Sequence, residues 1–157
     1  MSKLNKLIYF TITLLFFGFV DLHFSNLISA KVLSGWQFSN SMLNIIYIKN
    51  TGAAFSILQN STAFLIVISI VALMVMFYFV LKNLDNVLSR DIFFLSILTA
   101  GILGNLYERV LFGYVRDFFE LTFVNFPVFN ISDIFINVGV LGIISLILVT
   151  KKPIRIL

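Results

Sequence analysis

The sequence contains no cysteine, a single histidine (His23), two prolines and few charged residues. Without cysteine, the chain cannot form a disulfide or a thiolate metal site. The single histidine argues against a zinc site, because zinc normally takes several His or Cys ligands. We therefore expect no metal in the function, and no other cofactor.

Charge is scarce because most of the chain is apolar. Of the 157 residues, 60% are hydrophobic and 11% are charged, whereas soluble domains carry about 25% charged residues. This composition indicates an integral membrane protein with one domain over residues 1–157. The net charge of +4 does not indicate nucleic-acid binding, because the basic residues lie mostly at the ends of apolar segments.

Four apolar runs are long enough, or nearly so, to cross a bilayer as helices. They predict an all-α membrane protein with four transmembrane helices at about residues 7–22, 62–81, 92–107 and 134–150. The first run also resembles a signal peptide, but no cleavage site of small residues follows it. Residues 24–60 are mixed, and within them 43–48 are rich in β-branched and aromatic residues. We expect this segment to form a small β-containing lobe outside the membrane.

Four spans place both termini on one side of the membrane, and the basic residues indicate which side. On the side of the termini there are seven, Lys3, Lys6, Lys82, Arg90, Lys151, Lys152 and Arg155; on the other side there are four, Lys31, Lys49, Arg109 and Arg116. Because positive charge favours the cytoplasmic side, we expect both termini in the cytoplasm and the lobe at the outer face. Most of the polar residues beside apolar runs then share the outer level.

The stretch Gly101–Asp133 concentrates these polar residues, and it contains two aspartates on different elements. Asp117 and Asp133 are 16 positions apart, so they do not share one face of a helix. The topology allows them to meet across a groove, where two close carboxylates tend to share one proton. One aspartate can then take a proton from water while the other donates to a scissile carbonyl. We interpret the stretch as an active site at a membrane surface.

Spacing and composition alone leave other interpretations open. Asp133 can cap the fourth helix, Asp117 can pair with Arg116 or Arg109, and the asparagines can be cap or turn residues. Gly52 and the alanines after it can be a helix-packing surface, and Arg109 can be a membrane-edge residue. A transporter or proton-conducting protein also carries acids in its spans, but usually near the midplane. A structural or assembly protein is a further alternative.

Four short motifs resemble those of the bacterial lipoprotein signal peptidases (signal peptidase II). Residues 50–55 (NTGAAF) resemble the NxGAAF signature of that family, and residues 101–109 (GILGNLYER) its Gly-rich GNxxDR box. Residues 113–118 (GYVRDF) are similar to its GxVxDF box, and residues 126–133 (FPVFNISD) to its FPxFNxAD box. The four motifs occur in the family's order and lie between the hydrophobic runs.

The resemblance implies an aspartyl endopeptidase in the bacterial cytoplasmic (inner) membrane. Its substrates would be prolipoproteins that carry a diacylglyceryl cysteine, and a cut just before that cysteine would release the signal peptide. Asp117 and Asp133 match the two catalytic aspartates of the family. The motif residues that would line the site and help to hold substrate are Asn50, Gly52, Asn105, Arg109 and Asn130. The resemblance also implies binding of membrane lipid and of the cyclic peptide inhibitor globomycin; we expect a monomer and no nucleic acid.

The sequence departs from the family's pattern at three places. Glu108 stands where the family usually has Asp, which keeps the charge and adds a methylene group. Ser132 replaces the usual Ala. The first helix ends in Asp21-Leu22-His23-Phe24-Ser25 instead of a DQxxK-like pattern, so the Asp is kept while the Gln and Lys are absent. We expect Asp21 and Glu108 to support the site, and an inactive family member stays an alternative.

Overall fold

The structure of the protein, a computed structural model, describes residues 1–53 and 57–150, without the side chain of Thr150. Parts of two sequence predictions lie outside the described residues. They are the end of the first motif, Ala54 and Phe55, and three of the basic residues assigned to the side of the termini, Lys151, Lys152 and Arg155.

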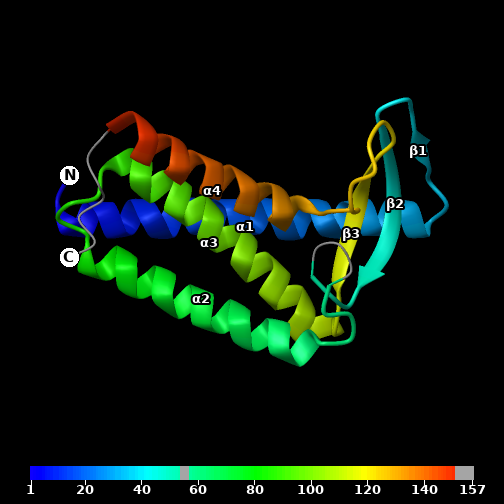
Figure 1. The fold of residues 1–157 in the computed structure, drawn as a ribbon, viewed down its shortest axis with the longest axis horizontal. Coiled ribbons are helices and arrows are strands. Elements are labelled where there is room, and N and C mark those ends of the chain that lie inside the picture. Colours follow the sequence, from blue (N-terminus) through cyan, green and yellow to red (C-terminus); the bar gives the residue numbers. More distant parts are fainter. Residues whose placement is uncertain (54–56, 151–157) are drawn as a thin grey trace.

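Four helices lie side by side, and a small sheet lies at one end of them (Figure 1). The helices are α1 (Lys3–Leu33), α2 (Thr62–Lys82), α3 (Ser89–Phe112) and α4 (Ile131–Thr150). The strands are β1 (Phe38–Ser39), β2 (Leu43–Asn50) and β3 (Val115–Leu121). Each helix is long and apolar enough to cross a membrane, so the predicted four-helix membrane fold with a small β-containing lobe is confirmed.

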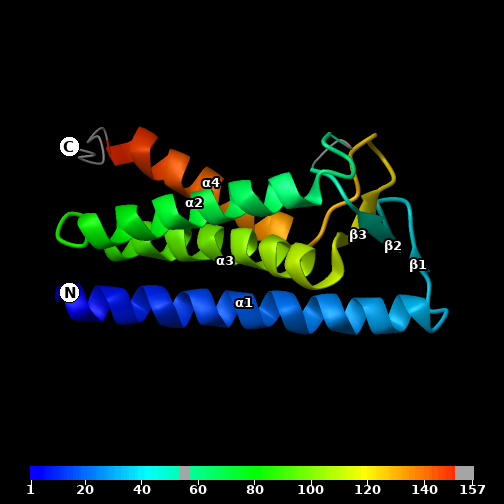
Figure 2. The ribbon, with the colours of Figure 1, turned by 90° about the horizontal axis from the view of Figure 1, so that it is seen from below.

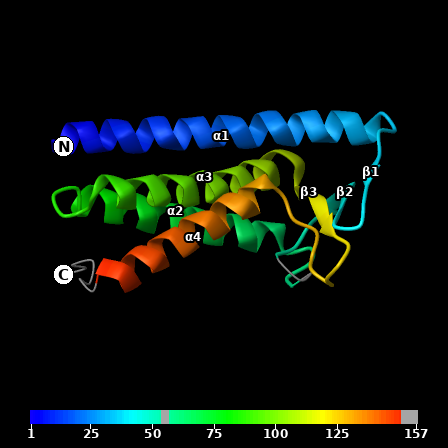
Figure 3. The same ribbon diagram turned by 90° about the horizontal axis from the view of Figure 1, so that it is seen from above.

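Helix α3 is the centre of the bundle and contacts the other three helices. Figures 2 and 3 show it lying between α1 and the remaining helices. In its apolar stretch 56% of the residues are buried, against 17% or less in the other helices. The other helices therefore present most of their apolar side chains outward, as expected where lipid replaces water as the solvent.

Glycines allow α3 and α4 to approach closely. A Cβ atom added at Gly139 would lie 2.6 Å from the Cβ of Leu98 and 2.8 Å from its backbone nitrogen. One added at Gly101 would lie 2.5 Å from the carbonyl oxygen of Ser132. Because lipid tails are as apolar as the helices, close packing of this kind is what holds membrane helices together.

Helix α1 continues to Leu33, well beyond the predicted end at residue 22, so the lobe does not begin at residue 24. The reason is a polar stripe with the spacing of a helix. Asp21, Ser25 and Ser29 recur every four residues, face inward and are buried. The sequence prediction ended the helix at about residue 22, but these polar residues lie on the inner face of a helix that continues past them.

The lobe is a three-stranded antiparallel sheet in the order β1-β2-β3. The predicted strand at residues 43–48 lies within β2, whereas β3 was not predicted. Gly113 ends α3 in the left-handed conformation with φ 79°, a backbone shape that favours glycine. The chain therefore turns at once from α3 into β3, where Asp117 pairs with Ile48 of β2.

The N-terminus and the turn between α2 and α3 lie at the end of the bundle opposite the sheet (Figure 1). Lys3 Nζ lies 2.8 Å from Asp85 Oδ2, and Lys6 Nζ donates to the carbonyl of Leu84 at 2.7 Å. The chain starts at this end and returns to it between α2 and α3, so successive helices alternate in direction, as four membrane spans require.

We predict that Gly139→Ala lowers the free energy of unfolding by about 1–3 kcal/mol, because the methyl group forces α4 away from α3. Thermal unfolding in detergent measures the change. Gly18→Ala on α1 is the matched control, since an added Cβ there meets no atom within 4 Å and Ala favours helix over Gly. Equal melting temperatures for the two variants would contradict the packing argument.

Candidate active site

The two predicted aspartates come from different elements and are joined by a pair of asparagines. Asp117 lies on β3, and Asp133 in the first turn of α4. Asn130 Nδ2 donates to Asp117 Oδ1 and to Asn105 Oδ1, both at 3.0 Å. Asn105 Nδ2 in turn donates to Asp133 Oδ1 at 2.9 Å. Because an amide nitrogen carries two protons, Asn130 makes both bonds at once, and we call this chain of bonds the asparagine relay.

Asp133 is also part of the cap of α4. Its backbone nitrogen donates to Asn130 Oδ1 at 2.9 Å, and the backbone nitrogen of Asn130 donates to Asp133 Oδ2 at 3.2 Å. This reciprocal pattern is a capping box, which satisfies backbone groups that the first turn of a helix leaves free. The N-cap residue is therefore Asn130 and not Asp133, which takes part in the cap from the third position of the helix. This role is compatible with a place in the site, because the cap fixes the direction of the carboxylate.

A third asparagine, Asn50 at the end of β2, holds the other oxygen of Asp117. Its Nδ2 donates to Asp117 Oδ2 at 2.8 Å, and its Oδ1 accepts from the backbone nitrogen of Gly52 at 2.9 Å. Asp117 is only 2% exposed. Both oxygens of this buried carboxyl therefore have a hydrogen-bond donor, each from a different part of the chain.

Burial raises the pKa of Asp117 from 3.8 to about 7. The hydrogen bond from Asn50 opposes this rise in pKa, and the negative charge of Asp133 adds to it. A carboxyl with this pKa is partly protonated at neutral pH. The pair can therefore hold one proton near neutral pH.

Arg109 reaches toward the relay from α3. Its Nη2 donates to the carbonyl of Gly52 at 2.9 Å and its Nη1 to the carbonyl of Asn105 at 3.3 Å. The guanidinium also attracts both aspartates electrostatically. Its Nε is buried and has no hydrogen-bond partner among residues 1–53 and 57–150, so one donor of this side chain is unused. Arg109 therefore belongs to the site and does not simply project to the membrane edge.

The predicted supporting residue Glu108 holds Arg116, which the sequence analysis did not place in the site. Glu108 Oε1 accepts from Arg116 Nη2 at 2.6 Å and Nε at 2.9 Å, and its Oε2 accepts from the backbone nitrogen of Arg116 at 2.7 Å. The alternative pairing of Arg116 with Asp117 is wrong, because neighbouring residues of a strand face opposite sides. The sequence analysis missed the place of Arg116 because it did not predict β3, along which successive side chains alternate between the two faces.

The other predicted supporting residue, Asp21 on α1, lies behind the relay. It accepts hydrogen bonds from Ser132 Oγ and, at 3.4 Å, from Ser25 Oγ. The structure thus brings together five of the predicted residues around the two aspartates, and it places Asp21 and Glu108 in separate buried contacts beside them. The five are Asn50, Gly52, Asn105, Arg109 and Asn130.

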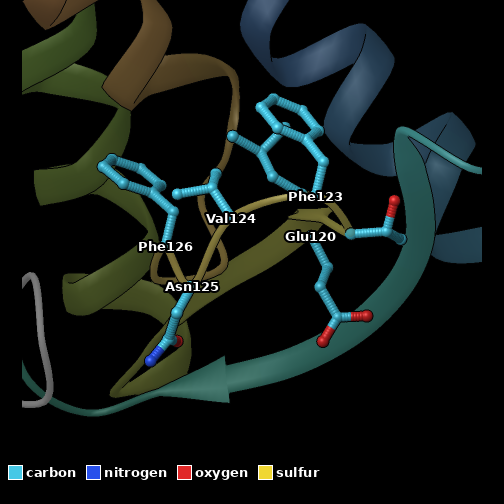
Figure 4. A pocket seen from close by; sticks show the side chains of 7 residues that line it. Glu120, Phe123, Val124, Asn125 and Phe126 are labelled. Carbon is cyan, nitrogen blue, oxygen red and sulfur yellow. The ribbon is translucent and has the colours of Figure 1, made fainter.

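A hollow of about 360 Å³ in the β3–α4 connection contains neither aspartate and is lined by consecutive residues only, 120–126. Figure 4 shows Phe123, Val124 and Phe126 on one side of this connection and Glu120 and Asn125 on the other. A hollow in a single loop brings no distant residues together, so we place the site at the relay. In the part of the chain that the structure describes, no group of three or more His, Cys, Asp or Glu could hold a metal ion.

Comparisons with known proteins identify relatives of the whole chain. A family model described as signal peptidase (SPase) II matches residues 12–149. The lipoprotein signal peptidase of Caldanaerobacter subterraneus subsp. tengcongensis is 38% identical over 144 residues, which cover 89% of this chain and 95% of that protein. The lipoprotein signal peptidase of Lactococcus lactis subsp. lactis is 32% identical over 159 residues, which cover 97% and 99% of the two proteins.

Solved structures agree with these relatives. One bacterial membrane enzyme matches with a TM-score of 0.80 and 31% identity, over 91% of this chain and 89% of its own. A second bacterial membrane enzyme matches with a TM-score of 0.76 and 32% identity, over 88% and 92%. At these identities the likeness extends beyond the fold to the sequence.

We predict that Glu108→Leu lowers the free energy of unfolding by about 3–5 kcal/mol, because it leaves Arg116 buried without its anion. Both side chains of the pair are 8% exposed. The double variant Glu108→Leu/Arg116→Met should recover part of that loss, since no buried charge then remains. Chemical unfolding of the two single variants and the double variant measures the coupling. If the loss of unfolding free energy in the double variant equals the sum of the losses in the two single variants, the two side chains do not interact and the ion pair is contradicted.

Proposed function

The chain belongs to the signal peptidase II family, and from this premise we propose that Asp117 and Asp133 are its catalytic carboxylates. Membership makes the protein an aspartic peptidase that removes signal peptides from prolipoproteins and a multi-pass membrane protein. The observation that carries our proposal is the asparagine relay, which links one aspartate on β3 to another on α4.

We propose that Asp117 holds the shared proton at rest, since burial raises its pKa to about 7. Asp133, as the carboxylate, takes a proton from a water molecule that attacks the scissile carbonyl carbon. Asp117 gives its proton to the carbonyl oxygen, so the tetrahedral intermediate carries no full negative charge. The C–N bond then breaks: Asp133 passes its proton to the leaving nitrogen, and a hydroxyl group of the intermediate returns a proton to Asp117 as the carbonyl re-forms, which restores the starting state.

The lipid-exposed helices and the placement of the relay support a lipidated substrate. The relay lies beside the sheet, at one end of four apolar helices, so a scissile bond near a membrane boundary would reach it. We propose that the substrate carries a diacylglyceryl cysteine, that the acyl chains stay in the bilayer and that the cut falls just before this cysteine. The guanidinium of Arg109, which donates to the carbonyl of Gly52 beside the relay, would help to hold the substrate.

The distribution of charge supports an orientation in the membrane. Basic residues at the end opposite the sheet include Lys3, Lys6, Lys82 and Arg90. Counted over the sequence, seven basic residues belong to the side of the termini and four to the side of the sheet. We therefore propose that both termini lie in the cytoplasm and that the site faces the outer side of the cytoplasmic membrane. The active unit would be a monomer, and a globomycin-type cyclic peptide would occupy the same site.

We predict that Asp117→Asn and Asp133→Asn each reduce turnover of a lipidated prolipoprotein by about 10²-fold or more, because each removes one proton-transfer group. A gel-shift assay with purified protein measures cleavage. Each amide is nearly the same size as the carboxyl group it replaces, so the variants should fold. Near-normal turnover by either variant would show that the aspartates are not the catalytic pair.

Matched controls separate catalysis from the loss of any carboxylate. Glu120→Gln changes an acid on the same strand as Asp117, where it accepts from Asn44 Nδ2 at 2.8 Å. Asp91→Asn changes an acid that caps α3 at the opposite end of the bundle, where it accepts from the backbone nitrogen of Leu88 at 2.8 Å. Both control variants should keep turnover within about twofold of the unchanged protein.

The pH dependence of cleavage should show the shared proton. Because the raised pKa of Asp117 is about 7, kcat/KM should fall as pH rises through this value, when the pair loses its proton. Asn50→Ala removes a hydrogen bond that lowers the pKa of Asp117, so the alkaline limb should move to higher pH. Asn125→Ala, in the exposed β3–α4 connection, is the control. An alkaline limb that stays in place in Asn50→Ala would contradict this assignment of the proton.

A further inference from the structure

We propose that Asn137 of α4 is a substrate-binding residue, whose side-chain amide pairs with the backbone of the signal peptide about two residues before the cut. The inference deepens the proposed function and rests on it, because it takes Asp133 as the position of the cut. Asn137 lies outside the four sequence motifs, and no step of the proposed proton transfer uses it.

The first argument is the presence of an exposed amide on an apolar helix. Of the described residues of α2 and α4, Asn137 is the one asparagine or glutamine, and it is exposed. Near it on α4 are the exposed apolar residues Ile134, Val138 and Leu141. Helix α4 packs against α3 and touches α1, so the described residues leave the side of α4 that carries this amide uncovered.

The second argument is the depth of the amide in the membrane. The apolar stretch of α4 is Ile131–Val149. Asn137 comes six residues after Ile131, which is about 9 Å along the helix axis. In a hydrocarbon layer about 30 Å thick, this position is surrounded by lipid tails. Because lipid offers no hydrogen bonds, a polar group at this depth needs a partner from a polypeptide.

The third argument is the hydrogen-bonding capacity that Asn137 leaves open. Its Nδ2 donates to the backbone carbonyl of Asp133 at 2.9 Å, which is the hydrogen bond that this side chain makes among residues 1–53 and 57–150. An amide has two N–H groups and an oxygen acceptor, so one donor and one acceptor remain side by side. A peptide backbone complements both with its C=O and N–H groups, whereas the esters of the acyl chains offer acceptors only.

The fourth argument is the position of Asn137 relative to the cut. Asn137 follows Asp133 by four residues, so both lie on one face of α4, about 6 Å apart along its axis. An extended peptide rises about 3.3 Å per residue, so Asn137 lies level with the second residue before a bond that is cut at Asp133. The apolar run of a signal peptide precedes its cut and therefore leads into the bilayer. Where it is extended for cleavage, its backbone lacks helical hydrogen bonds and needs partners from the enzyme.

The same contacts indicate that Asn137 is not needed for the fold. The carbonyl of Asp133 already accepts a helical hydrogen bond from the backbone nitrogen of Asn137, so loss of the side chain leaves no backbone group unpaired. Leucine is favoured over asparagine in a helix, and it is favoured in lipid. Asn137→Leu should therefore keep or raise the melting temperature while it binds substrate less well.

The test measures kcat and KM of the full chain in detergent–lipid micelles with a synthetic peptide that carries a diacylglyceryl cysteine. Asn137→Leu should raise KM about three- to tenfold. It should keep kcat within about twofold, because a contact away from the reacting bond is lost equally from the ground state and the transition state. Ser145→Leu is the matched control, since Ser145 is also exposed on α4, eight residues further along, and this variant should keep both constants.

A second peptide tests the partner of the amide directly. In it an ester oxygen replaces the N–H group of the second residue before the cut. With the unchanged protein the ester should raise KM by a similar factor, because it removes the donor to Asn137 Oδ1. With Asn137→Leu the ester should raise KM no further, so the two changes should not be additive in free energy. An ester two residues after the cysteine is the control and should leave the difference between the proteins unchanged.

Each other outcome overturns the inference. An unchanged KM in Asn137→Leu shows that the amide does not bind substrate, and a fall in kcat of more than twofold shows that it acts through Asp133. Effects on KM that multiply show that the amide and this N–H group do not meet. A smaller particle in light scattering of Asn137→Leu than of the unchanged protein shows that the partner is a second copy of the chain.

Asp133→Asn, assayed with the same peptides, distinguishes the failure of this inference from the failure of the proposed function. If Asp133→Asn cleaves the amide peptide at the normal rate, the proposed function fails. If Asp133→Asn is inactive, the results with Asn137→Leu bear on the substrate contact alone.

Discussion

The site depends on one side chain, the amide of Asn130, whose two N–H groups bond Asp117 on the sheet and Asn105 on α3. A backbone bridge between Phe119 of β3 and Phe129 brings the start of α4 to the sheet, and the amide of Asn130 then joins the two aspartates. The amide does so because it is both the cap of α4, fixed by Asp133, and the partner of a carboxyl on β3. An uncharged donor suits this position, since a cation there would favour ionisation of both acids and remove the proton that they share.

The fold explains how a chain with so few charges keeps several of them buried. Each buried acid has its own set of donors: amides for Asp117, hydroxyls for Asp21 and a guanidinium for Glu108. All of them lie at the sheet end of the bundle, while the rest of each helix is apolar and faces lipid or its neighbours. Because a charge in a lipid environment is costly, this separation lets the protein place reactive groups at the boundary without weakening its spans.

The sequence predicted the parts of this structure that local patterns determine. Apolar runs predicted four helices because length and hydrophobicity alone decide which segments cross a bilayer. The motif residues predicted which side chains would gather. The relay could not be predicted, because its bonds join residues that are 13 to 28 positions apart. Strand β3 was missed because Arg116, Asp117 and Glu120 interrupt its apolar pattern, and their partners on α1, β2 and α3 are visible only in the folded chain.

The central claim, that Asp117 and Asp133 share one proton, is tested most directly by following the infrared carbonyl band of protonated carboxyl groups during a pH titration. The account predicts one carboxyl that loses its proton near pH 7, in line with the raised pKa of Asp117, and that is absent in Asp117→Asn. In Asp133→Asn the same loss should move to lower pH, because a neighbouring negative charge has been removed. A band that titrates identically in all three proteins would contradict the shared proton.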